Sequence, residues 1–89
     1  MIERRIEVIN RLGLHARAAA KLVHLTGTFE SDVQLIIDGD EVDAKSILGI
    51  LMLGAAQGTI LDVRCDGGDE EEALEAVCDL FAQRFGEES

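Results

Sequence analysis

The sequence contains no proline, tryptophan or tyrosine, and its aromatic side chains are three phenylalanines. The core of the folded chain must therefore be built mainly from aliphatic side chains. Cysteine is also scarce: Cys65 and Cys78 are the two present, and they form neither a CxxC motif nor a metal-ligand spacing. We expect both to be free thiols in a reducing cytoplasm, with a disulfide between them as the minor alternative.

Basic side chains are few. Eight Lys and Arg stand against 18 Asp and Glu, which gives a net charge of −10. Nucleic-acid binding and attachment to anionic membranes need clusters of basic residues, so the composition argues against both functions. No segment approaches the roughly 20 apolar residues of a membrane span. The N-terminus has no apolar run of secretory length, and we expect a cytoplasmic protein without membrane insertion.

The chain of 89 residues is 47% apolar, which predicts a single folded domain over residues 1–89. Apolar residues alternate with polar ones in four segments, and each such segment is typical of a strand with one buried face. Three other segments have helical spacing. The predicted strands are Ile2–Val8, Asp32–Ile37, Glu41–Asp43 and Ile60–Cys65, and the predicted helices are Ala16–Thr26, Ser46–Leu53 and a segment that begins after Asp69.

The order of these segments is β-α-β-β-α-β-α. Because each strand has one apolar face, the sheet should be covered on one side only. We therefore predict an α+β fold, a two-layer open-faced sandwich in which three helices cover one face of a four-stranded antiparallel sheet.

Several local signals refine this prediction. Asp38-Gly39 is typical of a tight hairpin turn. Gly27 suits a left-handed residue at the end of the first helix. Asp69 and Glu72 have the spacing of a capping box at the start of the last helix. The expected buried face is Ala16, Ala19, Ala20 and Val23 in the first helix and Ala73, Val77, Leu80, Phe81 and Arg84 in the last.

The segment Gly13–Arg17 is the strongest candidate for a functional site, because it places His15 and Arg17 where a loop becomes a helix. The first backbone N–H groups of a helix have no partner inside it and carry a partial positive charge, so they bind anions. Here they belong to Ala16, Arg17 and Ala18. An arginine fork adds donors that suit phosphate, and imidazole adds a nucleophilic nitrogen. The combination predicts a histidine that accepts, holds and passes on a phosphoryl group.

Other kinds of site have weaker support. His24 is nine residues from His15, which does not place the two rings on one helix face, and no carboxylate lies four residues after His15. We expect His24 to be an exposed helix residue and predict no metal site and no cofactor. Cys65 and Cys78 fall in the interior of a strand and of a helix by pattern, which disfavours a nucleophilic triad.

The segment Ile47–Leu53 is apolar nearly all round, more than a half-buried short helix requires. Ile50 and Leu53 suit the core. The excess predicts an exposed apolar patch, and such patches often mark partner surfaces. We expect the partner interface to comprise Leu14, Ala20, Ile47, Leu48, Leu51 and Met52, although Met52 suits either the core or an interface.

Two segments of the chain resemble a known family. GLHARAAAKLV (Gly13–Val23) is similar to the active-site signature of the HPr family, the histidine-containing phosphocarriers of the bacterial phosphotransferase system. AKSILGILMLGA (Ala44–Ala55) resembles that family's second signature, around its regulatory serine. The chain length, the order of elements and the positions of both segments agree over nearly the whole sequence.

The resemblance implies a role for each matching residue. His15 would carry the phosphoryl group on Nδ1, and Arg17 would contact that group. Phosphate would come from phosphoenolpyruvate through enzyme I and pass to the A domains of sugar permeases or regulators. Ser46 would be the target of an HPr kinase/phosphorylase, although a serine at a helix start also serves as a plain N-cap. The chain would thus be a relay without turnover of its own, and a monomer by default.

Two alternatives stay open. One is a regulatory binding protein of the same fold; the other is an orphan or nitrogen-type relay that moves no sugar.

Ala18 departs from the family, which commonly has proline there, and so adds one N–H donor and removes some rigidity. Family members often carry lysines around the site, and Lys21 and Lys45 are the lysines that this chain offers.

Overall fold

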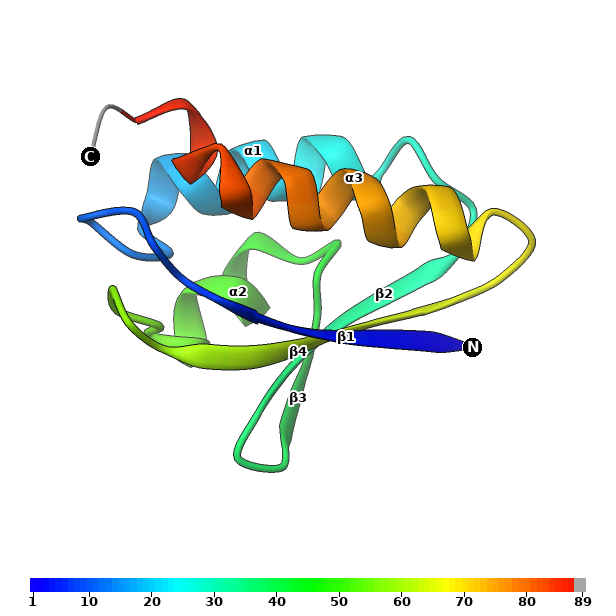
Figure 1. Cartoon of the computed structure of the whole chain (residues 1–89), viewed down its shortest axis with the longest axis horizontal. Coiled ribbons are helices and arrows are strands. Elements are labelled where there is room, and N and C mark those ends of the chain that lie inside the picture. Colours follow the sequence, from blue (N-terminus) through cyan, green and yellow to red (C-terminus); the bar gives the residue numbers. More distant parts are fainter. Residues whose placement is uncertain (88–89) are drawn as a thin grey trace.

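The computed structural model describes residues 1–87 and has two layers, with three α-helices on one face of a four-stranded sheet (Figure 1). The strand order is β1-β4-β2-β3, and all neighbouring strands are antiparallel. The predicted fold class and order of elements are confirmed. The elements are β1 (Ile2–Glu7), α1 (Ala16–Thr26), β2 (Asp32–Ile37), β3 (Asp40–Asp43), α2 (Ile47–Leu53), β4 (Ile60–Asp66), α3 (Glu70–Ala82) and a 3₁₀ turn, η1 (Arg84–Gly86).

The two central strands supply the apolar floor of the core. Leu61, Val63 and Cys65 of β4 are buried, as are Val33 and Leu35 of β2. Their alternation with exposed or half-buried polar residues is the period of two that the sequence predicted. Burial raises the pKa of the Cys65 thiol to about 11, and it raises the pKa of Cys78 as well. Both cysteines are free and buried, as predicted.

The β2–β3 hairpin closes at the predicted dipeptide. Asp38 and Gly39 both have positive φ, +51° and +86°. Two successive left-handed residues define the turn whose twist matches that of paired strands. The hairpin register that results pairs Ile37 with Asp40 and Gln34 with Asp43.

Helix α1 has the predicted bounds but buries a different face. Its buried residues are Ala18, Ala19, Leu22 and Thr26, whereas Ala16 and Ala20 are exposed. The predicted face was wrong because alanine lies on every side of this helix and gives no direction. Leu22 decides the orientation, since it is the large apolar side chain that lies fully buried.

The end of α1 also differs from the prediction. Gly27 is right-handed, with φ −64° and ψ −17°, and its N–H donates to the carbonyl oxygen of Val23. The chain leaves the helix through successive 3₁₀-type turns, in which the Thr28 N–H donates to the carbonyl oxygen of Leu25 and the Phe29 N–H to that of Thr26. Because these turns satisfy the last carbonyl groups, no left-handed residue is needed there.

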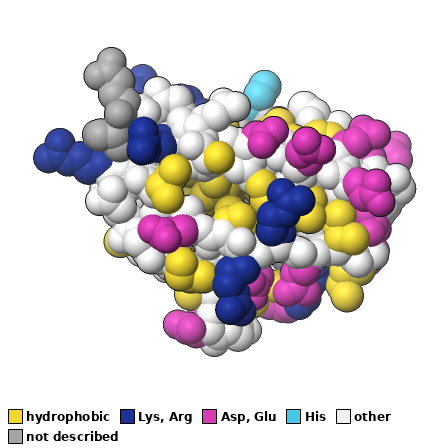
Figure 2. Space-filling view, viewed as in Figure 1, with side chains coloured by type: hydrophobic (Ala, Val, Ile, Leu, Met, Phe, Trp, Pro, Cys, Tyr) yellow, Lys and Arg dark blue, Asp and Glu magenta, His cyan; other side chains and the backbone are white. Residues whose placement is uncertain are grey.

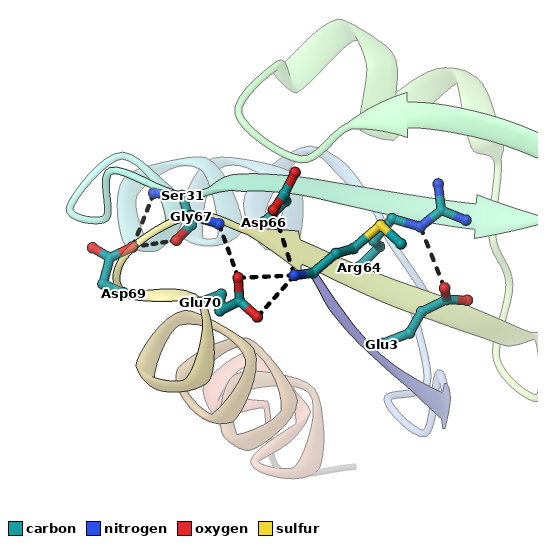
Figure 3. A network of polar contacts seen from close by, with 8 residues as sticks. Glu3, Ser31, Arg64, Asp66, Gly67, Asp69 and Glu70 are labelled. Carbon is teal, nitrogen blue, oxygen red and sulfur yellow. Dashed lines mark hydrogen bonds and ion pairs between the residues drawn. The ribbon is translucent and has the colours of Figure 1, made fainter.

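Asp69 caps no helix with its side chain, so the predicted capping box is wrong. Its carboxylate instead accepts hydrogen bonds from the N–H groups of Glu30 and Ser31, both at 2.9 Å. It also accepts from the Ser31 hydroxyl, and Figure 3 shows the two bonds from Ser31. These bonds, the one from the Ser31 side chain above all, lower the pKa of Asp69. Asp69 therefore ties the start of α3 to the loop before β2.

Glu70, the residue after Asp69, makes two further contacts at the start of α3. Glu70 accepts from the Gly67 N–H at 3.2 Å and pairs with the α-amino group of Met1 at 3.0 Å (Figure 3). The N–H of Gly67 thus has a partner in the first turn of α3, which holds the β4–α3 turn to the helix that follows it.

Helix α3 packs along the sheet beside α1. Its buried residues are Ala73, Leu74, Val77, Cys78 and Phe81. The prediction was right for Ala73, Val77 and Phe81. It was wrong for Leu80 and Arg84, and it omitted Leu74 and Cys78. Leu80 is half-buried. Arg84 lies beyond the helix in a left-handed turn and is exposed. None of the helices described between residues 1 and 87 has the length and apolar character of a membrane span.

Candidate functional site

His15 is the N-cap of α1, and its own side chain makes the cap. The residue has φ −77° and ψ 178°, and Nδ1 accepts a hydrogen bond from the Arg17 N–H at 3.2 Å. A backbone N–H can only donate, so Nδ1 carries a lone pair in this geometry. The side chain is 25% exposed. The ring therefore lies at the helix tip, within reach of solvent.

The loop before His15 is held by a close backbone approach. Gly13 has φ +67°, and the next residue, Leu14, donates its N–H to the carbonyl oxygen of Ala55 at 2.9 Å. A Cβ on Gly13 would lie 2.4 Å from that same oxygen. Glycine is thus required here for both the positive φ and the contact.

This loop corrects one predicted interface residue. Leu14 is 4% exposed and belongs to the core. The bond to Ala55 turns the backbone so that the Leu14 side chain points inward. Leu14 therefore fixes the loop before His15 to the core and does not offer a docking surface.

The predicted backbone donors lie in the first turn of α1, and the Arg17 N–H among them contacts the His15 ring. The first α-helical hydrogen bond of α1 runs from the Ala19 N–H to the carbonyl oxygen of His15 at 2.8 Å. The N–H groups of Ala16, Arg17 and Ala18 precede it and therefore have no helical acceptor. The Ala18 methyl group is fully buried, while the Arg17 side chain is exposed. This helix tip thus meets the geometric needs of an anion site.

The sequence pattern missed two residues of the site. Glu87 Oε2 lies 2.8 Å from His15 Nε2 and accepts from Asn10 Nδ2 at 2.9 Å. These bonds, chiefly the one with His15, lower the pKa of the Glu87 carboxyl. Glu87 lies 72 residues from His15 along the chain. No local motif marks such a contact, because folding alone brings the two residues together.

The charges of the surface differ between the ends of the molecule. Figure 2 shows Lys and Arg side chains gathered at the end that holds the N-terminus of α1, on the left, while Asp and Glu gather at the upper right, over the start of α3. The acidic first turn of α3 comprises Glu70, Glu71 and Glu72. A chain with a net charge of −10 thus keeps a basic region beside the helix tip that suits an anion.

Comparison with known proteins agrees with this geometry. The family model described as "PTS HPr component phosphorylation site" matches residues 2–83. The phosphocarrier protein HPr of Cupriavidus necator is 51% identical over 87 residues, with 98% of each chain covered. The phosphocarrier protein NPr of Proteus mirabilis is 44% identical over 86 residues, with 96% of each covered.

The chain belongs to the HPr family. A crystal structure of HPr from Thermoanaerobacter tengcongensis superposes with a TM-score of 0.96 at 45% identity and covers all of both chains. HPr from that organism has also been solved as a dimer, which matches this chain with a TM-score of 0.78. The recognition on which the sequence analysis relied is confirmed, and the chain is a phosphocarrier of the phosphotransferase-system type.

The second HPr signature forms α2 and the residue before it. Ser46 is half-buried, and its hydroxyl accepts from the Gly49 N–H at 3.1 Å, so the predicted N-cap is confirmed. Helix α2 packs beside α1. Ile50 is fully buried, whereas Ile47, Leu48, Leu51 and Met52 are 43%, 68%, 38% and 76% exposed. We call these four residues the α2 patch.

The remaining predictions concern lysine, His24 and metals. Lys21 and Lys45 donate to the carbonyl oxygens of Phe85 and Phe29, at 2.5 Å and 3.0 Å, so their ammonium groups also hold backbone in place. His24 is exposed, as predicted. In the part of the chain that the structure describes, no three His, Cys, Asp or Glu side chains are grouped so as to hold a metal ion.

The Gly13 contact predicts a large effect of a single methyl group. Gly13→Ala should lower the free energy of unfolding by about 3 kcal/mol, because it adds a steric clash to the cost of a left-handed alanine. The control is Gly54→Ala, since Gly54 has a similar φ of +59° and open space around its missing Cβ. That variant should cost about 1 kcal/mol. Urea unfolding of the three proteins measures both values, and equal losses would contradict the steric argument.

Proposed function

We propose that this chain accepts a phosphoryl group on His15 Nδ1 from phosphorylated enzyme I and passes it to a histidine on the A domain of a sugar permease or regulator. In this proposal it acts in the cytoplasm, as a monomer, and has no turnover of its own. The observation that carries the proposal is the position of Nδ1, 3.2 Å from the Arg17 N–H at the tip of α1. A nucleophilic nitrogen thus lies next to backbone N–H groups that can bind a phosphate, at the N-terminus of α1.

The hydrogen bonds of the ring support Nδ1 as the nitrogen that accepts the phosphoryl group. Nδ1 accepts from Arg17, so it bears no proton. Nε2 faces the Glu87 carboxylate, which accepts, so Nε2 bears the proton. The imidazole is therefore neutral, and its lone pair lies on the nitrogen next to the helix tip.

No proton changes place in the transfer when the donor's phosphohistidine carries a proton on its other ring nitrogen, because the donor ring then leaves as a neutral imidazole while His15 keeps its proton on Nε2 beside the Glu87 carboxylate. The Nδ1 lone pair attacks phosphorus in line, the bond from phosphorus to Nδ1 forms, and the bond to the donor histidine nitrogen breaks. Nδ1 must release the Arg17 N–H when it binds phosphorus. That N–H then joins those of Ala16 and Ala18, and the exposed Arg17 guanidinium adds charge, so the donors meet the phosphoryl oxygens as they arrive.

A phosphocarrier must also release the phosphoryl group. When the phosphoryl group leaves, His15 again accepts the Arg17 N–H and caps α1, and an N-cap bond contributes about 1 kcal/mol. The cap thus favours the unloaded state by a small amount. Arg17 holds phosphate from the solvent side, where water screens its charge. Both features support reversible transfer.

Loss of the ring should abolish phosphorylation. With phosphoenolpyruvate and a matched enzyme I, the wild type should gain one acid-labile phosphoryl group and His15→Ala none, as read by phosphorus NMR. Arg17→Ala should lower the rate of transfer roughly 10²-fold, since it removes a charge that stabilises the transition state. The control is Arg5→Ala, on the open face of the sheet, which should react like the wild type. Label on His15→Ala, or none on the wild type with a competent donor, would reject the proposal.

We assign partner docking to the α2 patch together with Ala20. The patch is apolar and exposed, and it lies on the helix that packs beside α1, whose tip carries His15. Burial of such side chains contributes about 25 cal/mol per Å² to association. A partner seated on the patch therefore reaches the phosphorylated ring from the side of α2.

Leu48→Asp should weaken transfer from enzyme I at least tenfold through a higher KM, because it places a charge in an apolar contact. The protein should remain folded, since Leu48 is 68% exposed. Ile60→Asp is the matched control, because the Ile60 side chain is 50% exposed on the face of β4 opposite buried Leu61, which is the face that the helices do not cover. Steady-state transfer assays with circular dichroism distinguish lost docking from lost folding. Equal effects of both variants would contradict the assignment.

Phosphorylation of Ser46 is the regulatory part of the proposal. The hydroxyl lies at the start of α2, next to Ile47 of the patch. A phosphate would add about −1.5 to −2 charges there, which a helix start tolerates. The same charge would repel an acidic partner and block docking without unfolding the chain.

An HPr kinase/phosphorylase with ATP should place one acid-stable phosphate on the wild type and none on Ser46→Ala. The modified protein should accept phosphate from enzyme I more slowly, by about tenfold or more, while its thermal midpoint changes little. Mass spectrometry and the transfer assay give the two readouts. An acid-stable adduct that persists in Ser46→Ala would refute this site.

The similarity to NPr supports a second candidate, a relay that ends on a regulator and moves no sugar. The chemistry at His15 is the same in both, so the acceptor distinguishes them. Transfer from the phosphorylated protein to the A domain of a sugar permease favours the first function, and transfer to a regulatory A domain alone favours the second.

A further inference from the structure

The last described turn of the chain has an unusual backbone. Arg84, Phe85 and Gly86 are left-handed in succession, with φ of +57°, +55° and +80°. Side chains other than glycine rarely adopt this region, so the surrounding structure must hold two of these three residues there. The chain leaves α3 through this turn and continues to the end of the molecule that holds the N-terminus of α1 (Figure 1).

Two contacts hold this turn. The Phe85 ring is 1% exposed and packs edge-on against Phe81, with ring centroids 4.8 Å apart. Lys21 of α1 donates from Nζ to the Phe85 carbonyl oxygen at 2.5 Å. The turn is therefore anchored both in the core and on the helix that carries His15.

This turn places Glu87 next to His15. Its Oε2 meets His15 Nε2 at 2.8 Å and the Asn10 amide at 2.9 Å. Asn10 is fully buried and donates from the same Nδ2 to the Gly13 carbonyl oxygen at 2.8 Å. Among residues 1–87 its Oδ1 has no hydrogen-bond partner. The amide is thus oriented entirely as a donor, which suits the acceptor that Glu87 supplies.

We infer that Glu87 is a positioning residue that determines which nitrogen of His15 takes the phosphoryl group, an inference that rests on the proposed function of His15. An unconstrained histidine offers both ring nitrogens, and Nε2 is the less hindered because Nδ1 lies next to the Cβ substituent. In this fold the carboxylate keeps the proton on Nε2. The lone pair is left on Nδ1, which faces the donors at the tip of α1.

The carboxylate has a second effect on the ring. A hydrogen bond from Nε2–H to a carboxylate orients the ring and makes the other nitrogen a better electron-pair donor, as it does for histidines that bind metals. The Arg17 N–H alone is a weaker guide, since it is a neutral donor at 3.2 Å. Removal of Glu87 should therefore allow the proton to exchange between the two nitrogens.

A chemical donor tests this inference without any partner protein. Phosphoramidate transfers its phosphoryl group to imidazole: its P–N bond breaks, ammonia leaves with the proton it needs, and a new bond from phosphorus to a ring nitrogen forms. Nitrogen-15 NMR of labelled histidines identifies the phosphorylated nitrogen. His24 is exposed, and among the described residues its ring makes no hydrogen bond, so it reports the intrinsic preference of the reagent in the same sample.

The proteins to compare are the wild type, Glu87→Ala and the control Glu75→Ala, at an exposed position of α3. The wild type and Glu75→Ala should carry phosphate on Nδ1 of His15. In Glu87→Ala the ratio of Nδ1 to Nε2 product should fall about tenfold or more, as expected from loss of one charge-assisted hydrogen bond. A Glu87→Ala protein that retains the wild-type ratio, or a wild type that reacts at Nε2, would overturn the inference.

The tautomer of the unmodified ring gives a second measurement, which a general loss of stability would not mimic. The wild type should show a protonated Nε2 and an unprotonated Nδ1, and Glu87→Ala a mixture of both forms. A single Nε2–H tautomer in both proteins would also overturn the inference. Failure of enzyme I to phosphorylate the wild type would instead reject the relay, so the two proposals fail separately.

Discussion

The hydrogen bond from the Arg17 N–H to His15 Nδ1 connects the fold of this chain to its chemistry. It caps α1, shows that Nδ1 bears a lone pair, and keeps that lone pair among N–H groups that have no helical partner. In the proposed function, phosphorylation of His15 must open this bond and release of the phosphoryl group must restore it. The ordinary need of a helix for an N-cap would then be part of a reversible transfer.

Much of the remaining structure serves to hold this cap in place. Gly13 approaches the Ala55 carbonyl oxygen so closely that a methyl group does not fit, and Leu14 beside it is buried. On the other side, the left-handed turn after α3 brings Glu87 to Nε2. The ring of His15 thus contacts Arg17 and Glu87 directly, and the loop before it is held by Ala55. The antiparallel sheet makes this possible, because its strands return the chain repeatedly to the same layer of helices.

Local patterns predicted the elements well and the partners of side chains poorly. The bounds of α1, the hairpin at Asp38 and the cap at Ser46 depend on residues within a few positions of one another, and all three were predicted. The capping box at Asp69 failed because Ser31 and Glu30, far away in sequence, offer its carboxylate better donors. The left-handed end at Gly27 failed for a related reason, since successive turns already satisfy the helix end there.

The sequence by itself determined the order of strands and helices, the aliphatic core and the meeting of His15 and Arg17 at a helix start, because period, turn residues and caps act over short stretches of chain. It also identified the HPr family. Only the tertiary structure decided that Leu14 is core, which face of α1 is buried, and that Glu87 binds the His15 ring. These depend on packing between distant segments, where burial and hydrogen-bond geometry in three dimensions select one partner among many that a pattern allows.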